Sequence, residues 1–156
     1  MPLNTLIAEH HFFAGMSSEH LKILTDCAML SEFKKDQLIF SEGDPANRFY
    51  LILDGEIALE SHVRDSGTVP IETIRSGGVL GWSWLFPSYL WHFDARALKD
   101  TKAVFFYGTR LREECEQDHS LGYELMKRTA EVMIQRLQAT RRQLLDAVGI
   151  LPGAGD

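Results

Sequence analysis

The stretch Phe49-Tyr50-Leu51-Ile52-Leu53-Asp54-Gly55-Glu56-Ile57-Ala58-Leu59-Glu60 decides the fold. Its two apolar runs have the composition of strands, and they are separated by Asp54-Gly55, a dipeptide that marks tight turns. Gly55 supplies the positive φ that such a turn needs at no steric cost. The stretch therefore predicts two consecutive strands joined by a short turn.

The same period of two extends outward from residue 32 to residue 106. Turn signals such as Gly43 and Gly77-Gly78 divide this region into short segments. Many short strands at regular intervals indicate an antiparallel roll or barrel. The predicted strands span residues 38–40, 49–53, 56–60, 71–74, 93–97 and 103–106.

Helical patterns flank this β region on both sides. Residues 3–29 are predicted to be helical, with Ser17 or Ser18 as an N-cap. Residues 109–148 are helical again, and Gly149 and Pro152 end the pattern. Acidic residues crowd its start and basic residues follow, the order that the helix dipole favours: Glu113, Glu114, Glu116 and Asp118, then Arg136, Arg141 and Arg142.

The C-terminal helical segment also carries a narrow seam whose members alternate four and three residues apart. They are Met126, Ala130, Met133, Leu137, Thr140, Leu144 and Ala147. The seam either packs on the β region or pairs with a second copy of the helix. Because it is narrow and contains a threonine, we expect a homodimer through this helix.

Composition indicates one soluble domain of 156 residues. The net charge of −6 argues against nucleic acid as the main partner, because phosphate contacts need clustered Lys and Arg. No signal peptide or membrane-spanning run is found, and the two cysteines form no motif, so we predict a cytoplasmic protein with reduced thiols. Scattered histidines and the lack of a phosphate loop or metal motif favour a protein that is not an enzyme and holds no metal.

Several segments resemble the cyclic nucleotide-binding domain of the catabolite activator (Crp/Fnr-like) class. Residues 6–17 look like its first helix, residues 33–46 like its first roll strand and turn, and residues 49–57 like its central hairpin. Residues 136–140 are similar to the ligand-facing stretch of its long helix. The resemblance covers residues 6–148.

The resemblance implies a mainly β fold with flanking helices. We expect a single domain: N-terminal helices in residues 1–30, an eight-stranded antiparallel β-roll (a jelly roll, or double-stranded β-helix) in 31–108, C-terminal helices in 109–148, and a tail in 149–156. Activator-class proteins continue into a helix-turn-helix. This chain stops at Asp156, so direct action on nucleic acid is not expected, and neither is a membrane partner.

Residues 81–97 depart from the family at the ligand pocket. All three tryptophans lie here, in a run that predicts a compact lid or pocket wall between two strands. The family's phosphate cassette begins Gly-Glu and later supplies an Arg to the cyclic phosphate. Here it begins Gly81-Trp82, and Trp91, followed by His92, takes the place of the Arg. Losing one member of a buried charge pair costs roughly 3–5 kcal/mol, so cAMP or cGMP is possible only as a weak or altered ligand.

The candidate ligand-binding residues come from this cassette and from the long helix. Backbone N–H groups near Ser83 and Trp84 are placed to receive an anion, while Arg96 is expected to pair with Asp94 on the surface. Thr140 matches the residue that reaches the base, and Arg141 replaces its small polar neighbour. The full set is Gly81, Trp82, Ser83, Trp84, Leu85, Trp91, His92, Thr140 and Arg141.

Two functions follow from these observations. In the first, the chain is a stand-alone sensor or regulatory module that binds a non-standard small-molecule effector, or a cyclic nucleotide weakly, and signals through a dimerising C-terminal helix. In the second, the tryptophans fill the pocket, and the chain is a ligand-free dimeric scaffold. The identity of the ligand, the downstream partner and the pathway are not encoded in any motif of the sequence.

Overall fold

The structure is a computed structural model that describes residues 2–149. Three short helical elements begin the chain, α1 (Leu3–Glu9), the 3-10 helix η1 (His11–Phe13) and α2 (Ser18–Asp26). Ser17 is the N-cap of α2, as predicted, and its hydroxyl accepts the His20 N–H at 3.2 Å. The helices end before residue 29, because β1 begins at Ala28, so the β-roll starts earlier than the expected residue 31.

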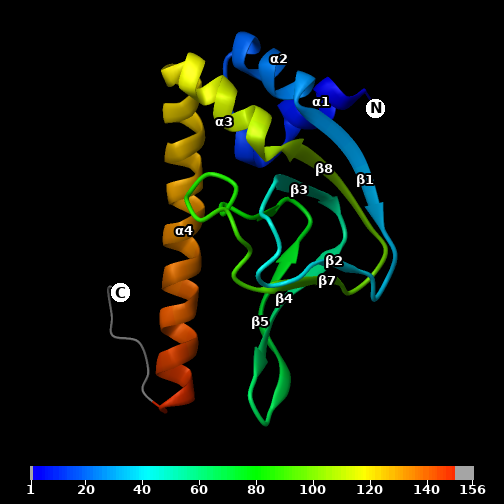
Figure 1. Cartoon of the computed structure of the whole chain (residues 1–156), viewed down its shortest axis with the longest axis vertical. Coiled ribbons are helices and arrows are strands. Elements are labelled where there is room, and N and C mark those ends of the chain that lie inside the picture. Colours follow the sequence, from blue (N-terminus) through cyan, green and yellow to red (C-terminus); the bar gives the residue numbers. More distant parts are fainter. Residues whose placement is uncertain (1, 150–156) are drawn as a thin grey trace.

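The β-roll consists of two four-stranded antiparallel sheets within the described part of the chain (Figure 1). One sheet has the order β1-β8-β3-β6 and the other β2-β7-β4-β5. This confirms the expected fold. The strands are β1 (Ala28–Phe33), β2 (Leu38–Phe40), β3 (Arg48–Asp54), β4 (Glu56–Val63), β5 (Gly67–Arg75), β6 (Val79–Leu80), β7 (Asp94–Ala97) and β8 (Thr101–Tyr107).

The Asp54-Gly55 turn passes the chain from one sheet to the other. Gly55 has φ 142°, and a Cβ there would overlap the Thr101 side chain. β3 pairs with β6 and β8, whereas β4 pairs with β5 and β7. The predicted tight turn is therefore present, but the expected central hairpin is not, because the two strands that it joins are not partners.

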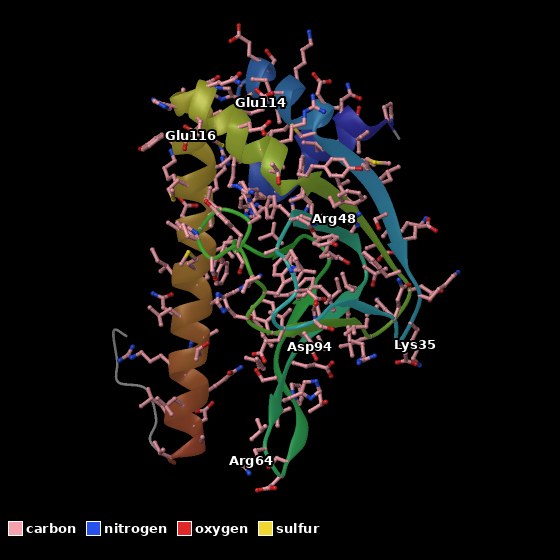
Figure 2. All side chains as sticks on the ribbon, viewed as in Figure 1. Lys35, Arg48, Arg64, Asp94, Glu114 and Glu116 are labelled. Carbon is pink, nitrogen blue, oxygen red and sulfur yellow. The ribbon has the colours of Figure 1, made fainter. Side chains whose placement is uncertain are left out.

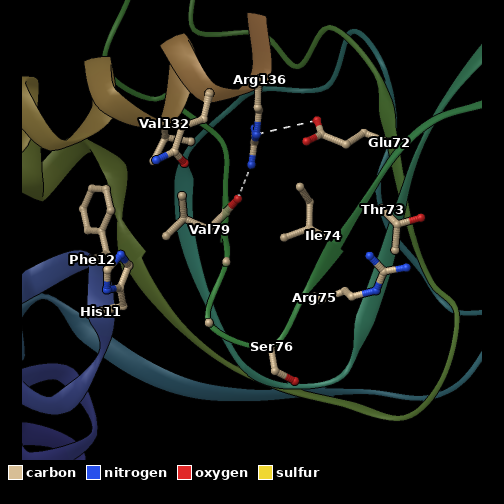
Figure 3. Close-up of a pocket in the computed structure, with 13 residues that line it drawn as sticks. His11, Phe12, Glu72, Thr73, Ile74, Arg75, Ser76, Val79, Val132 and Arg136 are labelled. Atoms are coloured by element: carbon tan, nitrogen blue, oxygen red, sulfur yellow. Dashed lines mark hydrogen bonds and ion pairs between the residues drawn. The ribbon is translucent and has the colours of Figure 1, made fainter. Parts of the chain in front are cut away.

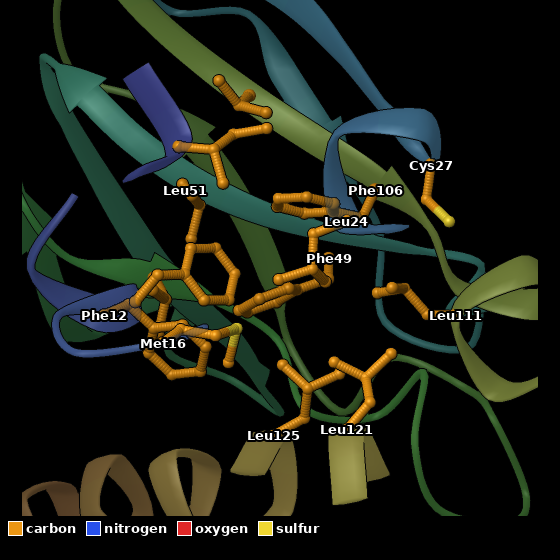
Figure 4. Packing of buried hydrophobic residues seen from close by; sticks show 14 of the residues in the cluster. Phe12, Met16, Leu24, Cys27, Phe49, Leu51, Phe106, Leu111, Leu121 and Leu125 are labelled. Carbon is orange, nitrogen blue, oxygen red and sulfur yellow. The ribbon is translucent and has the colours of Figure 1, made fainter. Parts of the chain in front are cut away.

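Alternation along β3 divides the buried side chains into two cores. Phe49 and Leu51 face the helices in what we call the helical core, whereas Tyr50 and Ile52 face the space between the sheets, the roll core. Figure 4 shows the helical core, in which side chains from α2, α3 and the first turns of α4 meet the outer face of the sheet.

Two helices follow the roll, α3 (Gly108–Gln117) and α4 (His119–Ala147). Asp118 separates them and caps α4, its carboxylate accepting the Leu121 N–H at 3.2 Å. The helical segment expected over residues 109–148 is therefore two helices, and of the acidic residues at its start Asp118 lies beside the long helix as its N-cap. Glu114 and Glu116 lie on α3, as Figure 2 shows, and the first turn of α4 carries no acidic residue.

Candidate functional site

A groove of about 550 Å³ separates α4 from the roll. Its lining comes from β4, β5, the loop before β7 and the second half of α4. Because the side chains facing it are mostly apolar, the groove suits a ligand with a hydrophobic body. The apolar lining includes Leu59, Ile71, Phe93, Met133, Ile134 and Leu137.

Arg136 is the cation of this groove, and it reaches from α4 to the roll. Its Nε lies 3.6 Å from a Glu72 carboxylate oxygen, and its Nη2 donates to the Val79 carbonyl. The guanidinium lies 4.8 Å from the Trp82 ring centroid, within cation–π range. Burial lowers the pKa of Arg136, and the Glu72 carboxylate partly offsets this effect. The group nevertheless stays charged, because arginine does not deprotonate in proteins.

The aromatic loop, residues 81–93, connects β6 to β7 as the expected wall between two strands. Its turns are closed by backbone hydrogen bonds, Leu85 N–H to the Trp82 carbonyl at 3.0 Å and Tyr89 N–H to the Phe86 carbonyl at 2.9 Å. Residues 82–88 of the loop form turns and bends rather than a helix.

The three tryptophans of the loop have different environments. Trp84 is fully buried in the helical core, 5.7 Å from the Phe49 ring. Trp91 is buried in the roll core. Trp82 is partly exposed and lines the groove. Two of the indoles thus fill cores, as the scaffold hypothesis requires, and one lines an open groove, as the sensor hypothesis requires.

Trp91, which the resemblance places at the family's arginine, stacks on Phe40. The ring centroids are 3.7 Å apart and the planes differ by 6°. Gly81 makes this arrangement possible, because a Cβ at that position would overlap the Trp91 ring. Gly81 also has φ 88°, which an L side chain rarely adopts.

The remaining predicted site residues do not form one cluster. Thr140 lines the groove, so the structure brings it together with Trp82. Ser83 is buried, and Leu85 packs against the helical core. His92 and Arg141 are exposed and outside the residues lining the groove. Of the nine predicted residues, the groove lining therefore contains Trp82 and Thr140.

The expected Asp94–Arg96 surface pair is not formed. Asp94 is buried, accepting the Glu42 N–H at 2.7 Å and lying 2.9 Å from His62 Nε2. Arg96 instead contacts Glu60 at 3.2 Å. The prediction was wrong because each side chain finds a partner across the strand pair β4–β7 rather than along its own strand.

Glu72 and Arg136 were absent from the predicted site. Arg136 belongs to the stretch that resembles the ligand-facing part of the family's long helix, and that resemblance is the one signal for it. Glu72 lies on β5, far away in sequence, and no spacing rule connects the two residues. The path of the chain between β5 and α4 is what brings them into contact.

Other chemistry has little support in the part of the chain that the structure describes. No three His, Cys, Asp or Glu side chains among residues 2–149 are grouped to hold a metal ion. Burial raises the pKa of the Cys115 thiol to about 11, so this residue is not activated as a nucleophile. None of the described helices is both long enough and apolar enough to cross a membrane.

Comparisons with known proteins agree with this architecture. The structure of a protein from Geobacter metallireducens GS-15, described as a cyclic nucleotide-binding protein, is similar to this one. The TM-score is 0.79 and the identity 28%, and the match covers 88% of this chain and 99% of that one. The sensor domain of the transcriptional regulator DNR from Pseudomonas aeruginosa shares the fold, with a TM-score of 0.69 and 18% identity over 86% of this chain and 91% of that one.

Two curated regulators are related in sequence. The anaerobic regulatory protein of Bacillus subtilis is 25% identical over 83% of this chain and 55% of its own length. The CRP-like cAMP-activated global transcriptional regulator of Mycobacterium tuberculosis is 20% identical over 94% of this chain and 63% of its own length. The chain thus spans less than two thirds of either relative.

The profile of the cyclic nucleotide-binding domain matches residues 30–118, which is more than half of the chain and includes every strand after β1 as well as α3. Both curated relatives are named as regulators. The chain therefore belongs to the cyclic nucleotide-binding domain family.

Proposed function

We propose that this chain is a cytoplasmic sensor module that binds a small-molecule effector in the groove between α4 and the roll. The observation that carries the proposal is the groove itself, about 550 Å³ of mostly apolar space beside Trp82 and the second half of α4. Both cysteines are free thiols, in keeping with a cytoplasmic protein.

The output of the sensor is a change in the position of α4. An effector in the groove touches the roll on one side and α4 on the other, so it shifts the equilibrium between two placements of the helix. Part of the predicted seam lines the groove (Ala130, Met133, Leu137 and Thr140), and the seam is also open to solvent, with Leu137 70% and Leu144 64% exposed. We infer that a second copy covers this face, so that helix movement changes the geometry of a homodimer.

The ligand is not an ordinary cyclic nucleotide held in the family manner. The resemblance puts Trp82 in place of the Glu that binds the ribose, and Trp91 in place of the Arg that binds the phosphate. Trp91 is 3% exposed and stacked, so it leaves no space at that point for a phosphate. We expect cAMP and cGMP to bind weakly or not at all.

A ligand-free scaffold is the second candidate. It is favoured by the burial of Trp84 and Trp91, which occupy core positions rather than a cavity. In that case the exposed face of α4 is the functional surface, and the groove is filled by a partner or by water.

Fluorescence titration separates the two candidates. Because Trp82 lines the groove while Trp84 and Trp91 are buried, an effector should change the emission of Trp82. The titration should include cAMP, cGMP, cyclic dinucleotides and flat apolar compounds, with melting temperature as a second readout. Trp82→Phe should remove the emission change, and Ala130→Trp, which fills the groove, should abolish binding. No response in emission or melting temperature to any compound would support the scaffold instead.

A further inference from the structure

The guanidinium of Arg136 lacks its full set of partners. Its side chain is 11% exposed, and the buried Nη1 has no hydrogen-bond partner among residues 2–149. The Nε–Glu72 distance of 3.6 Å exceeds the 2.7–3.2 Å of a good hydrogen bond. A buried donor left without a partner is costly, so the structure holds a cation that gains from an additional acceptor.

The charges of the groove lie at one point of its wall. Among the described residues that line it, Arg136 is the one cation and Glu72 the one anion, and Thr140 adds one hydroxyl. The rest of the lining is apolar. A ligand that matches this pattern has a hydrophobic body and a single charged group at one edge.

The same ion pair also lines a second cavity, of about 340 Å³, on the side of His11 and Val132. In Figure 3, Arg136 extends from α4 toward the roll, between Glu72 and the Val79 carbonyl. Glu72 is 29% exposed in its side chain, so its carboxylate can turn toward solvent without being buried elsewhere. The space on both sides of the pair lets a ligand group approach the guanidinium once Glu72 moves.

We propose that the effector is an apolar monoanion whose carboxylate, sulfonate or phosphoryl group is bound by Arg136, with Glu72 as a built-in competitor for that cation. This inference rests on the proposed function and names the chemical class of its ligand. The apolar body lies against Trp82 and Leu137. A sugar-phosphate fits less well, because the described lining offers its hydroxyl groups few polar side chains beyond Glu72 and Thr140.

Two fluorescent probes with the same aryl-naphthylamine skeleton test the charge requirement. 8-Anilinonaphthalene-1-sulfonate carries one sulfonate, and N-phenyl-1-naphthylamine carries none. The wild-type chain should bind the sulfonate probe about tenfold more tightly, the size of effect expected of a hydrogen bond to a charged group. Blocking the groove with Ala130→Trp should abolish the binding of both probes and so locate them.

Three variants assign the preference to Arg136. Arg136→Gln should reduce the affinity for the sulfonate probe about tenfold and leave the neutral probe unchanged. Arg142→Gln, which removes an exposed arginine of the same helix, should change neither. Glu72→Gln should raise the affinity for the sulfonate probe severalfold, because it removes the competing carboxylate.

Equal affinity of the wild-type chain for the two probes would overturn the inference while leaving the proposed function intact. An equal effect of Arg142→Gln and Arg136→Gln would do the same, as would displacement of the sulfonate probe by micromolar cAMP. Failure of the folded wild-type chain to bind either probe would instead count against the proposed function. If circular dichroism shows that Arg136→Gln does not fold, Glu72→Gln provides the test. An affinity of Glu72→Gln for the sulfonate probe equal to that of the wild-type chain overturns the inference.

Discussion

The two halves of α4 have different surroundings. In the first half, Leu121 and Leu125 are buried in the helical core, and Arg128 donates to the Phe12 and Ala14 carbonyls at 2.9 Å. In the second half, Arg136 reaches Glu72 of the roll, and Ile134, Leu137 and Leu144 are exposed. In Figure 1 the same helix leaves the bundle of short helices and continues along the roll. The first half is therefore fixed by packing, and the second half is free to respond to a ligand or a partner.

The largest expected effect comes from truncating the packed half. Leu121→Ala removes a fully buried side chain, so it should lower the free energy of unfolding by about 2–5 kcal/mol. Leu144→Ala, at a position 64% exposed, should change it by less than about 0.5 kcal/mol. Urea denaturation at concentrations where the chain is monomeric measures both. Equal losses would show that the two halves are held equally well.

A smaller loss of unfolding free energy is expected on replacing Arg128, which links the first half of α4 to the Phe12 and Ala14 carbonyls. Arg128→Gln removes two hydrogen bonds from a largely buried cation to backbone carbonyls and should cost about 1.5–3 kcal/mol. Arg142→Gln in the exposed half should cost almost nothing. The same denaturation experiment compares them, and a loss confined to Arg142→Gln would reverse our assignment of the fixed half.

Low pH should destabilise the segment whose carbonyls, at Phe12 and Ala14, accept hydrogen bonds from Arg128. His10 accepts the Phe12 N–H at its Nδ1, which places the ring proton on Nε2, 3.4 Å from the Ile52 carbonyl. Burial lowers the pKa of His10, and the Ile52 carbonyl partly offsets this effect. In the unfolded chain His10 has the ordinary histidine pKa of 6.5, so below pH 6.5 the unfolded chain binds more protons than the folded chain. The free energy of unfolding therefore falls as the pH drops from 6.5 toward the lowered pKa of the folded chain.

The measurement is the free energy of unfolding at a series of pH values. His10→Gln should reduce the loss of unfolding free energy below pH 6.5. His11→Gln, which replaces an exposed side chain, should leave that loss in place. A decline that His10→Gln does not alter would place the titrating group elsewhere.

The smallest effect on monomer stability is expected at the seam. Leu137 is already 70% exposed, so Leu137→Glu should change the free energy of unfolding by less than about 0.5 kcal/mol. The oligomeric state should nevertheless change, because a charge in the seam disfavours pairing. Light scattering should give a dimer for the wild-type chain and a monomer for the variant. A wild-type monomer at high micromolar concentration would contradict the dimer proposal.

The sequence predicted the roll well where the alternation is strong and poorly where it is weak. β3 and β4 show it clearly, whereas β1 follows α2 almost without a break, and its burial hardly alternates. β6 has two residues, too few for any period. On α4 the seam was visible, but it is open to solvent and in part lines the groove, so it does not hold the helix to the roll. The stripe that holds the helix consists of Leu121, Leu125, Thr129, Val132 and Arg136.

The candidate site was less predictable than the fold, for a physical reason. Its aromatic loop was evident from composition, yet composition does not say which indole faces a core and which faces a groove. The Glu72–Arg136 contact depends on tertiary structure alone, and a polar residue inside an apolar stripe gives no sign of its partner.

The Trp91–Phe40 stack bears on any attempt to engineer a nucleotide receptor from this chain. The single substitution Trp91→Arg would put a guanidinium against Phe40 and Gly81 and leave a void where the indole had been. We expect this variant to melt at a lower temperature and to gain no affinity for cAMP. The loop and the roll interior pack against each other at this point, so a charged pocket here would require several exchanges at once.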